Sequence, residues 1–311
     1  MIGGLFDSNS LRSDKKVSRR VIISAHERKF DITFSIVACD LEEQAWGVAV
    51  ASKFPAVGAV VPWAQADAGA LATQSFANTS FGPRGLALMG TGLSAQQTLA
   101  RLLEHDPDKE LRQVGLVDAK GGSATFSGSG CFAWAGGVTG KGYAIQGNIL
   151  AGRRVVPAME KAFLKTKGHL PTRLHGALLA GDRAGGDKRG RQSAAIYVVK
   201  PKGGYGGYLD RWLDYRVDDH PHPVPRLGEL LEMHELYFGK SEEIERVELK
   251  GTALKQLTDI LVQESYLKKG SDFRAAFNEF IGNENFEERA DPEAKWIDGP
   301  VLKYLVKKFQ K

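Results

Sequence analysis

Residues 33–53 read TFSIVACDLEEQAWGVAVASK, and their pattern predicts a β-hairpin. From Thr33 to residue 40, hydroxyl, small and apolar side chains alternate with a period of two, which is typical of a strand. A short polar turn follows, and a second alternating segment runs to Lys53. The two strands of a hairpin pair antiparallel, so we expect Thr33 to lie beside Ser52 and Lys53 at one end of a sheet.

The rest of the chain groups strands and helices in blocks. Ser94 and Gln97 form a predicted capping box, and Pro62 indicates a bulge or an edge strand because proline lacks the ladder N–H. Further strands are expected at 57–75, with a turn at 67–69, and at 112–119, 124–127, 142–150, 193–200 and 212–217; helices are expected from 95 to about 105, and at 153–166, 171–180 and 227–238. Gly181 is expected to cap the helix at 171–180. This grouping favours an α+β fold over a βαβ winding.

Composition excludes several classes of protein. The 311 residues are 42% hydrophobic and 25% charged, which is ordinary for a globular protein. The net charge of +5 is small, and its excess lies in residues 12–29 and near the C-terminal end, so no broad nucleic-acid surface is implied. No run reaches the roughly 18 apolar residues of a membrane span. We therefore expect neither nucleic acid nor membrane as a partner.

The first residues and the cysteines bear on location. Residues 1–31 contain basic side chains but only VIISA as an apolar core, which is too short for a secretory signal. We expect a disordered leader on a cytoplasmic protein. Cys39 and Cys131 both lie in apolar sequence, and two buried free thiols are expected in preference to a disulfide.

Six sequence blocks resemble one family. They are TFSIVA (33–38), GVAVASK (47–53), VVPWA (60–64), ATQ (72–74), DKRGRQSAA (187–195) and RVDDHP (216–221). Together they resemble an uncharacterised family related to the N-terminal-nucleophile (Ntn) hydrolases, domain of unknown function 1028, over about residues 32–238. The resemblance implies a four-layer αββα sandwich, with two antiparallel sheets between layers of helices.

The composition changes after Gly239. Residues 240–311 are charged, poor in glycine and rich in helix patterns. ENFEER (284–289) and IDGPVL (297–302) resemble a peptidoglycan-binding domain. We therefore expect an Ntn-hydrolase-like domain at 32–239 and a small helical module at 240–311; the alternative is a helical tail that packs on the main domain or on a second subunit.

Thr33 is the candidate nucleophile that the resemblance implies. An Ntn nucleophile attacks an amide carbonyl through its hydroxyl and uses its own free α-amine as the base. Lys53 would lower the pKa of that amine by repulsion between like charges, and would favour an oxyanion. The alternative is a structural strand threonine beside a lysine.

One feature opposes this hypothesis. Thr33 has 32 residues before it, so its nitrogen is an amide and cannot act as a base. The Ile32–Thr33 bond must be cut, or the true start must lie further on; otherwise catalysis through an N-terminal threonine is excluded.

Four residues at strand ends are further candidates. Asn148 and the N–H of Gly147 are expected to stabilise an oxyanion, and an ordinary turn asparagine is the alternative. Gln74 and Ser75 end another strand, which we expect to reach the same rim and to contact substrate.

The charged loop at 182–193 is the second candidate region. Asp187, Arg189 and Arg191 are expected to orient a charged substrate, because arginine can clamp a carboxylate with two hydrogen bonds. Gln192 and Ser193 belong to the same substrate-binding segment of the resemblance. A solvated surface loop is the alternative.

Asp219 and His220, with Asp218 and His222, have the residue types of a metal site. Both histidines precede prolines in a loop, and the spacing supplies no third set of ligands. We therefore expect Asp219 and His220 to form hydrogen bonds near the substrate, and we expect no metal and no organic cofactor.

The resulting prediction is an Ntn-hydrolase-like amidohydrolase that cleaves a small amide or peptide and forms a homo-oligomer. A peptidoglycan fragment is a further expected partner, through the C-terminal module. The alternative is a catalytically silent binding or scaffold protein with the same fold.

Overall fold

The computed structural model describes residues 33–239 and 245–309. The leader expected at 1–31, and the Ile32 side of the Ile32–Thr33 bond, lie outside these residues. Among the described helices, none is long and apolar enough to cross a membrane.

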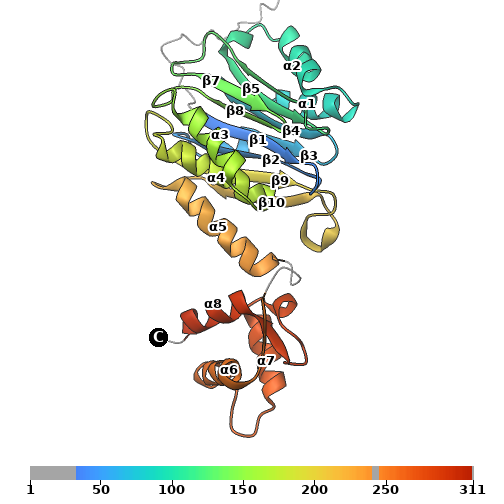
Figure 1. Cartoon of the computed structure of the whole chain (residues 1–311), viewed down its shortest axis with the longest axis vertical. Helices are drawn as coiled ribbons and strands as arrows, with labels where there is room; N and C mark the ends of the chain where they lie inside the picture. Colours follow the sequence, from blue (N-terminus) through green and yellow to red (C-terminus); the bar gives the residue numbers. More distant parts are fainter. Residues whose placement is uncertain (1–32, 240–244, 310–311) are drawn as a thin grey trace, which may run out of the picture. The chain divides into compact units, whose positions relative to one another are not determined.

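Two antiparallel sheets form the main domain (Figure 1). The first sheet has the strand order β10-β9-β2-β1-β8-β7, and the second has the order β3-β4-β5-β6. The first consists of β1 (Thr33–Asp40), β2 (Ala45–Ser52), β7 (Gly136–Gly140), β8 (Tyr143–Gly147), β9 (Ser193–Val199) and β10 (Arg211–Val217). The second consists of β3 (Pro62–Gln65), β4 (Gly69–Ser75), β5 (Arg112–Asp118) and β6 (Ser123–Ser127). β1 and β2 form the expected hairpin, and Thr33 pairs with Ser52.

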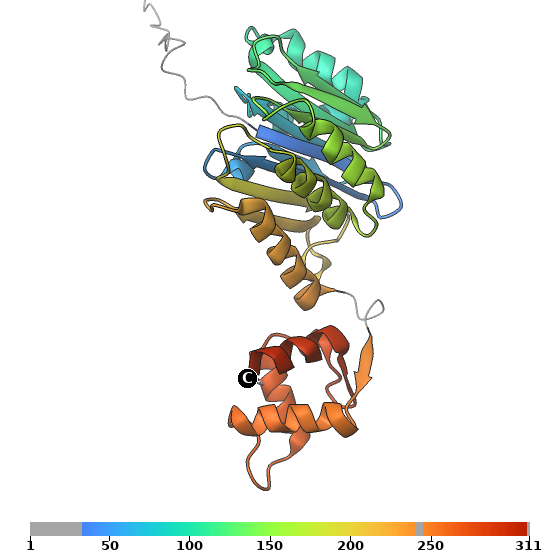
Figure 2. The ribbon, with the colours of Figure 1, turned by 60° about the vertical axis from the view of Figure 1, so that its left-hand side comes forward.

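Helices cover the outer face of each sheet, which gives four layers (Figures 1 and 2). The first sheet packs on α3 (Val155–Lys165), α4 (Leu170–Arg183) and α5 (Pro223–Phe238), and the second on α1 (Phe81–Gly90) and α2 (Ala95–Glu104). The alternation of β1 explains the layering: Phe34 and Ile36 join the core under α3 and α4, whereas Val37 joins the core between the sheets. The predicted α+β fold is confirmed.

Local signals in the sequence have clear outcomes. The capping box of Ser94 and Gln97 is present at the start of α2, and Pro62 begins an edge strand, as predicted. The strand pair expected from residue 57 begins only at Pro62. The predicted cap at Gly181 is wrong, since α4 continues to Arg183. Gly181 instead allows close packing between helices, because a Cβ there would lie 2.7 Å from Met159 Cγ.

The C-terminal residues build a core of their own. It contains β11 (Arg246–Glu248), β12 (Trp296–Asp298), α6 (Gly251–Gln263), α7 (Phe273–Asn283) and α8 (Gly299–Phe309). Phe277 and Phe280 are fully buried in this core. Arg289 and Asp298 form a buried ion pair of 2.6 Å, and Arg289 also donates to the carbonyls of Glu235 and Gly239. Arg289 therefore links Asp298 of β12 to the C-terminal end of α5.

Gly82 tests the close packing of α1 on the second sheet. A Cβ at Gly82 would lie 2.1 Å from the Trp63 ring, so we expect Gly82→Ala to lower the free energy of unfolding by about 1–3 kcal/mol in urea titrations. Gly90→Ala is the matched control in the same helix, because its Cβ would meet only Ala68, at 3.9 Å. We expect Gly90→Ala to be neutral or stabilising by up to about 1 kcal/mol. Equal losses in the two variants would contradict the packing argument.

The buried Arg289–Asp298 pair should be needed for the stability of the C-terminal core. Arg289→Met leaves the Asp298 carboxylate buried without a cation, and should destabilise the C-terminal core by about 3–5 kcal/mol. Hydrogen exchange of the α6, α7 and α8 amides would measure the loss. Arg274→Met is the control, since the Arg274–Glu293 pair is exposed, and we expect it to cost less than about 1 kcal/mol. Similar exchange rates in the two variants would exclude a structural role for the buried pair.

Candidate active site

Thr33 begins β1 on the face between the two sheets. Its side chain is 1% exposed, and its hydroxyl donates to Ser52 Oγ at 3.2 Å. This contact follows from the register, because directly paired residues of antiparallel strands present their side chains to the same face. The hydroxyl of the candidate nucleophile is thus held in one position by the neighbouring strand.

Both sheets hold the Thr33 carbonyl. Asn148, which directly follows β8, donates its backbone N–H to the Thr33 oxygen at 3.1 Å. Gln74, near the end of β4 in the facing sheet, donates Nε2–H to the same oxygen at 3.2 Å. The structure therefore brings together three residues that the sequence placed at strand ends, Thr33, Gln74 and Asn148.

A buried polar network surrounds this carbonyl. Ser35 donates to Gln74 Oε1 at 2.7 Å and accepts from Gln146 Nε2 at 2.7 Å. Gln113 Oε1 accepts from Gln74 Nε2 at 2.8 Å and from Asn148 Nδ2 at 2.9 Å. Polar groups buried between sheets need such partners, and a connected network fixes their orientations.

The network was only partly visible in the sequence. Ser35, Gln113 and Gln146 each occupy a strand position that faces the other sheet, where apolar residues are the rule. A polar residue at such a position indicates a buried polar network. Recognising it in the sequence requires knowing which face of each strand packs against the other sheet.

One atom of the network is unsatisfied. Asn148 is fully buried, and among the described residues its Oδ1 has no hydrogen-bond partner. Its Nδ2 donates to Gln113 Oε1, and this contact uses one of the two amide N–H groups. The side chain thus offers both a donor and an acceptor beside Thr33.

Lys53 lies just after β2, and its side chain is exposed. Its backbone N–H donates to Asp187 Oδ2 at 2.8 Å, and its Nζ donates to the Arg191 carbonyl at 3.4 Å. Ser52, not Lys53, is therefore the residue that contacts the Thr33 hydroxyl. Lys53 lies next in sequence to this contact.

The charged loop is anchored by its own ion pairs. Asp187 is buried; Oδ1 accepts the Arg189 N–H at 2.8 Å, and the Arg189 guanidinium lies 3.2 Å from Oδ2. Arg191 Nε donates to Asp182 Oδ1 at 2.6 Å, and this contact raises the pKa of Arg191. Both arginines thus pair with carboxylates inside the loop.

The remaining predicted residues connect this loop to its neighbours. Gln192 donates from Nε2 to Asp219 Oδ1 at 3.2 Å, and its carbonyl accepts the His220 N–H at 2.8 Å. Ser193 Oγ accepts the Val57 N–H at 3.1 Å. These contacts join the start of β9 to the loops beside it.

Ser75 ends β4 in the left-handed region, with φ of 67°, and is buried. Gly147 ends β8, pairs with Phe34, and its carbonyl accepts from Gln113 Nε2 at 2.8 Å. Within the described ranges, no three His, Cys, Asp or Glu side chains are grouped as metal ligands.

The two cysteines are free thiols. Burial, with Asp118 and Asp40 nearby, raises the pKa of Cys39 to about 12. Burial also raises the pKa of Cys131. Both groups are therefore protonated at neutral pH, and neither has the character of a nucleophilic thiolate.

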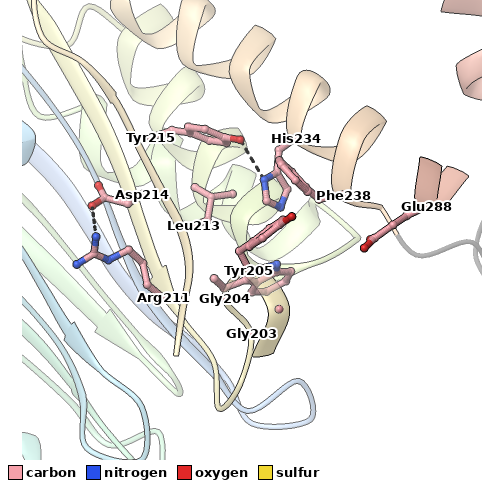
Figure 3. A pocket seen from close by; sticks show the side chains of 12 residues that line it. Gly203, Gly204, Tyr205, Arg211, Leu213, Asp214, Tyr215, His234, Phe238 and Glu288 are labelled. Carbon is pink, nitrogen blue, oxygen red and sulfur yellow. Dashed lines mark hydrogen bonds and ion pairs between the residues drawn. The ribbon is translucent and has the colours of Figure 1, made fainter. Parts of the chain in front are cut away.

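A separate recess lies beside β10 (Figure 3). Tyr205, Tyr215 and Phe238 contribute aromatic rings, and the Tyr215 hydroxyl lies 3.1 Å from His234 Nδ1. Burial lowers the pKa of His234 and raises that of Tyr215, so a neutral tyrosine meets a neutral imidazole. Since β9 and β2 lie between β10 and β1, this recess is not part of the Thr33 cluster.

Comparisons with known proteins define the family. A family model described as "Family of unknown function (DUF1028)" matches residues 33–227, and the chain belongs to this family. A second model, "Putative peptidoglycan binding domain", matches residues 237–305. The resemblances inferred from the sequence blocks are thereby confirmed.

A solved structure supports the same assignment. The chain is similar to protein SPO2555 from Silicibacter pomeroyi, of the same family, with 30% identity and a TM-score of 0.60. The match covers 66% of this chain and 86% of that one. The comparison with curated proteins gave no match.

Cys39, at the end of β1 away from Thr33, provides a test of the effect of burial on a thiol pKa. With a pKa of about 12, roughly one thiol in ten thousand is ionised at pH 8, so iodoacetamide should leave Cys39 unmodified in the folded chain. Peptide mass spectrometry after native and denatured labelling measures the difference. Rapid alkylation of Cys39 in the folded chain would show that this thiol is ionised and accessible. Cys39 would then be a candidate nucleophile.

Proposed function

We propose that the chain is an Ntn-hydrolase-like amidohydrolase that cleaves a small amide or peptide, with Thr33 as nucleophile once the Ile32–Thr33 bond is hydrolysed. The position of Thr33 carries the proposal. It begins a central strand at the interface of two sheets, with its hydroxyl on Ser52 and its carbonyl bonded from both sheets. Such fixed geometry favours attack along one direction.

The chemistry then needs no group from outside the cluster. The freed α-amine takes the Thr33 hydroxyl proton as Oγ1 attacks the substrate carbonyl, which gives a tetrahedral oxyanion. The C–N bond breaks, the proton passes to the leaving amine, and an ester to Thr33 remains. Water, deprotonated by the same amine, hydrolyses the ester and releases the acid.

Neighbouring residues have distinct proposed roles. The second Nδ2–H of Asn148 would stabilise the oxyanion. The Gly147 N–H points away from β1, because the next residue, Asn148, is the one whose N–H bonds to Thr33. Lys53 would disfavour the ammonium form of Thr33 by like-charge repulsion. Arg189 would hold an acidic group of the substrate, with Asp187 orienting its guanidinium. Gln192 and Ser193 would form the adjoining wall.

A second candidate is a binding or scaffold protein without catalysis. Two observations favour it: Thr33 is 1% exposed, and the Asp187 carboxylate is engaged within the protein. In that case the C-terminal module would supply the function, by binding a peptidoglycan fragment. Retention of the full chain on insoluble peptidoglycan, with no amidase activity in any processed form, would favour this candidate.

Intact-mass spectrometry and two variants test the enzyme proposal. We expect an active preparation to contain a chain that starts at Thr33. In that chain, Thr33→Ala should lower amidase kcat by roughly 10³-fold or more, whereas Thr33→Ser should keep measurable turnover because it retains a hydroxyl and an α-amine. An uncut chain with full activity, or unchanged turnover in Thr33→Ala, would exclude this mechanism.

A further inference from the structure

We propose that Oδ1 of Asn148 accepts a hydrogen bond from the α-ammonium group of Thr33 and so raises the pKa of that amine. This inference rests on the proposed function, since the amine exists only after the Ile32–Thr33 bond is hydrolysed. Asn148 would then be a positioning residue for the catalytic base, in addition to its role near the oxyanion.

The backbone places the Thr33 nitrogen on the side of Asn148. In an antiparallel pair, the N–H and C=O of one residue point to the same neighbouring strand. The Thr33 carbonyl accepts the Asn148 N–H at 3.1 Å, so it points toward the chain that leaves β8. The Thr33 nitrogen therefore faces Asn148 as well.

The side chains of Thr33 and Asn148 also share a face. Ser35 pairs with Gln146, and Gln146 Nε2 donates to Ser35 Oγ at 2.7 Å, so both side chains lie between the sheets. Thr33 lies two residues before Ser35, and Asn148 lies two residues after Gln146. Because side chains alternate between the two faces of a strand, Thr33 and Asn148 should lie on that same face. Directly opposed Cβ atoms lie about 4.5–5.5 Å apart, within reach of an amide.

The unmet acceptor is the second observation. Asn148 is fully buried and its Oδ1 has no partner among the described residues. Its orientation is fixed, because Nδ2 donates to Gln113 Oε1, and Gln113 is held in turn by Gln74 Nε2. A buried acceptor without a donor is unfavourable, and an ammonium group would supply the donor.

Charged groups around the site come from one side. Lys53 follows β2, and the segment 182–191 contributes two carboxylates and two guanidinium groups, Asp182, Asp187, Arg189 and Arg191, which pair with each other. The residues that bond to the Thr33 carbonyl, Gln74 and Asn148, have neutral amide side chains, and so does Gln113, which accepts from both. Asn148 is therefore the side chain whose change should affect the amine without breaking an ion pair.

Asn148 and Lys53 should shift the pKa of the Thr33 amine in opposite directions. An acceptor stabilises the ammonium form and raises the pKa of the amine, whereas Lys53 lowers it. Removing Oδ1 should therefore lower the pKa, and replacing the amide with a carboxylate should raise it.

The test is a titration of the Thr33 amine. A chain made as Met-Thr33, with the methionine removed, begins at β1 and contains both hydrophobic cores. Intact mass verifies the start, and the pH dependence of the Thr33 ¹³Cα resonance gives the pKa. We expect Asn148→Leu to lower it by roughly one unit, and Asn148→Asp to raise it by about as much.

Ser127→Ala is the matched control. Ser127 accepts from Gln113 Nε2 at 2.7 Å, so this variant removes a bond of the same network without touching Thr33. It should leave the pKa within roughly 0.3 units of the parent chain. An unchanged pKa in Asn148→Leu, or an equal shift in Ser127→Ala, would overturn the inference.

The titration requires no turnover, so it separates the two proposals. If the pKa moves as expected but Thr33→Ala does not alter amidase activity, the contact stands and the proposed function fails. If turnover depends on Thr33 while the pKa ignores Asn148, the contact alone fails.

Discussion

The hydrogen bond from Gln74 to the Thr33 carbonyl joins the two sheets at the point where the candidate site forms. Gln74 belongs to the second sheet and Thr33 to the first, so this 3.2 Å contact requires both sheets at their native separation. A neutral amide can make such a contact in a buried layer, because it brings donors and acceptors without a net charge to desolvate. Ser35 and Gln113 are also neutral polar residues in this buried layer, and each forms a hydrogen bond with Gln74.

The layer between the sheets is divided by chemistry. Toward the end of β1 near Cys39, it is filled by apolar side chains, most of them valine and alanine. Toward Thr33 it is polar, and Gly115 leaves the space that the Gln146 amide occupies, since a Cβ there would lie 2.0 Å from Gln146 Oε1. A rigid polar end beside an apolar layer can hold a reacting group in one geometry, for catalysis or for binding.

Several features could be predicted from local sequence. The β1–β2 hairpin and the pairing of Thr33 with Ser52 follow from a period of two and a short turn. α1 and β7 were not predicted, because glycine and proline obscure the helix pattern of α1, and glycines dominate β7. Gly181 was misread because a glycine that ends a helix and one that packs against a neighbour look alike in sequence.

The hairpin, the α+β class, the family and the strand-end position of Thr33 can all be inferred from sequence, since each depends on patterns of residues close together in the chain. The side chains that contact Thr33 cannot be inferred in this way, because they come from distant segments. In the folded chain the Thr33 hydroxyl contacts Ser52 and Gln74 of the facing sheet donates to the Thr33 carbonyl. Asn148 Oδ1 has no partner among the residues that the structure describes. These contacts depend on how two sheets stack, and stacking is set by packing between segments that are distant in sequence.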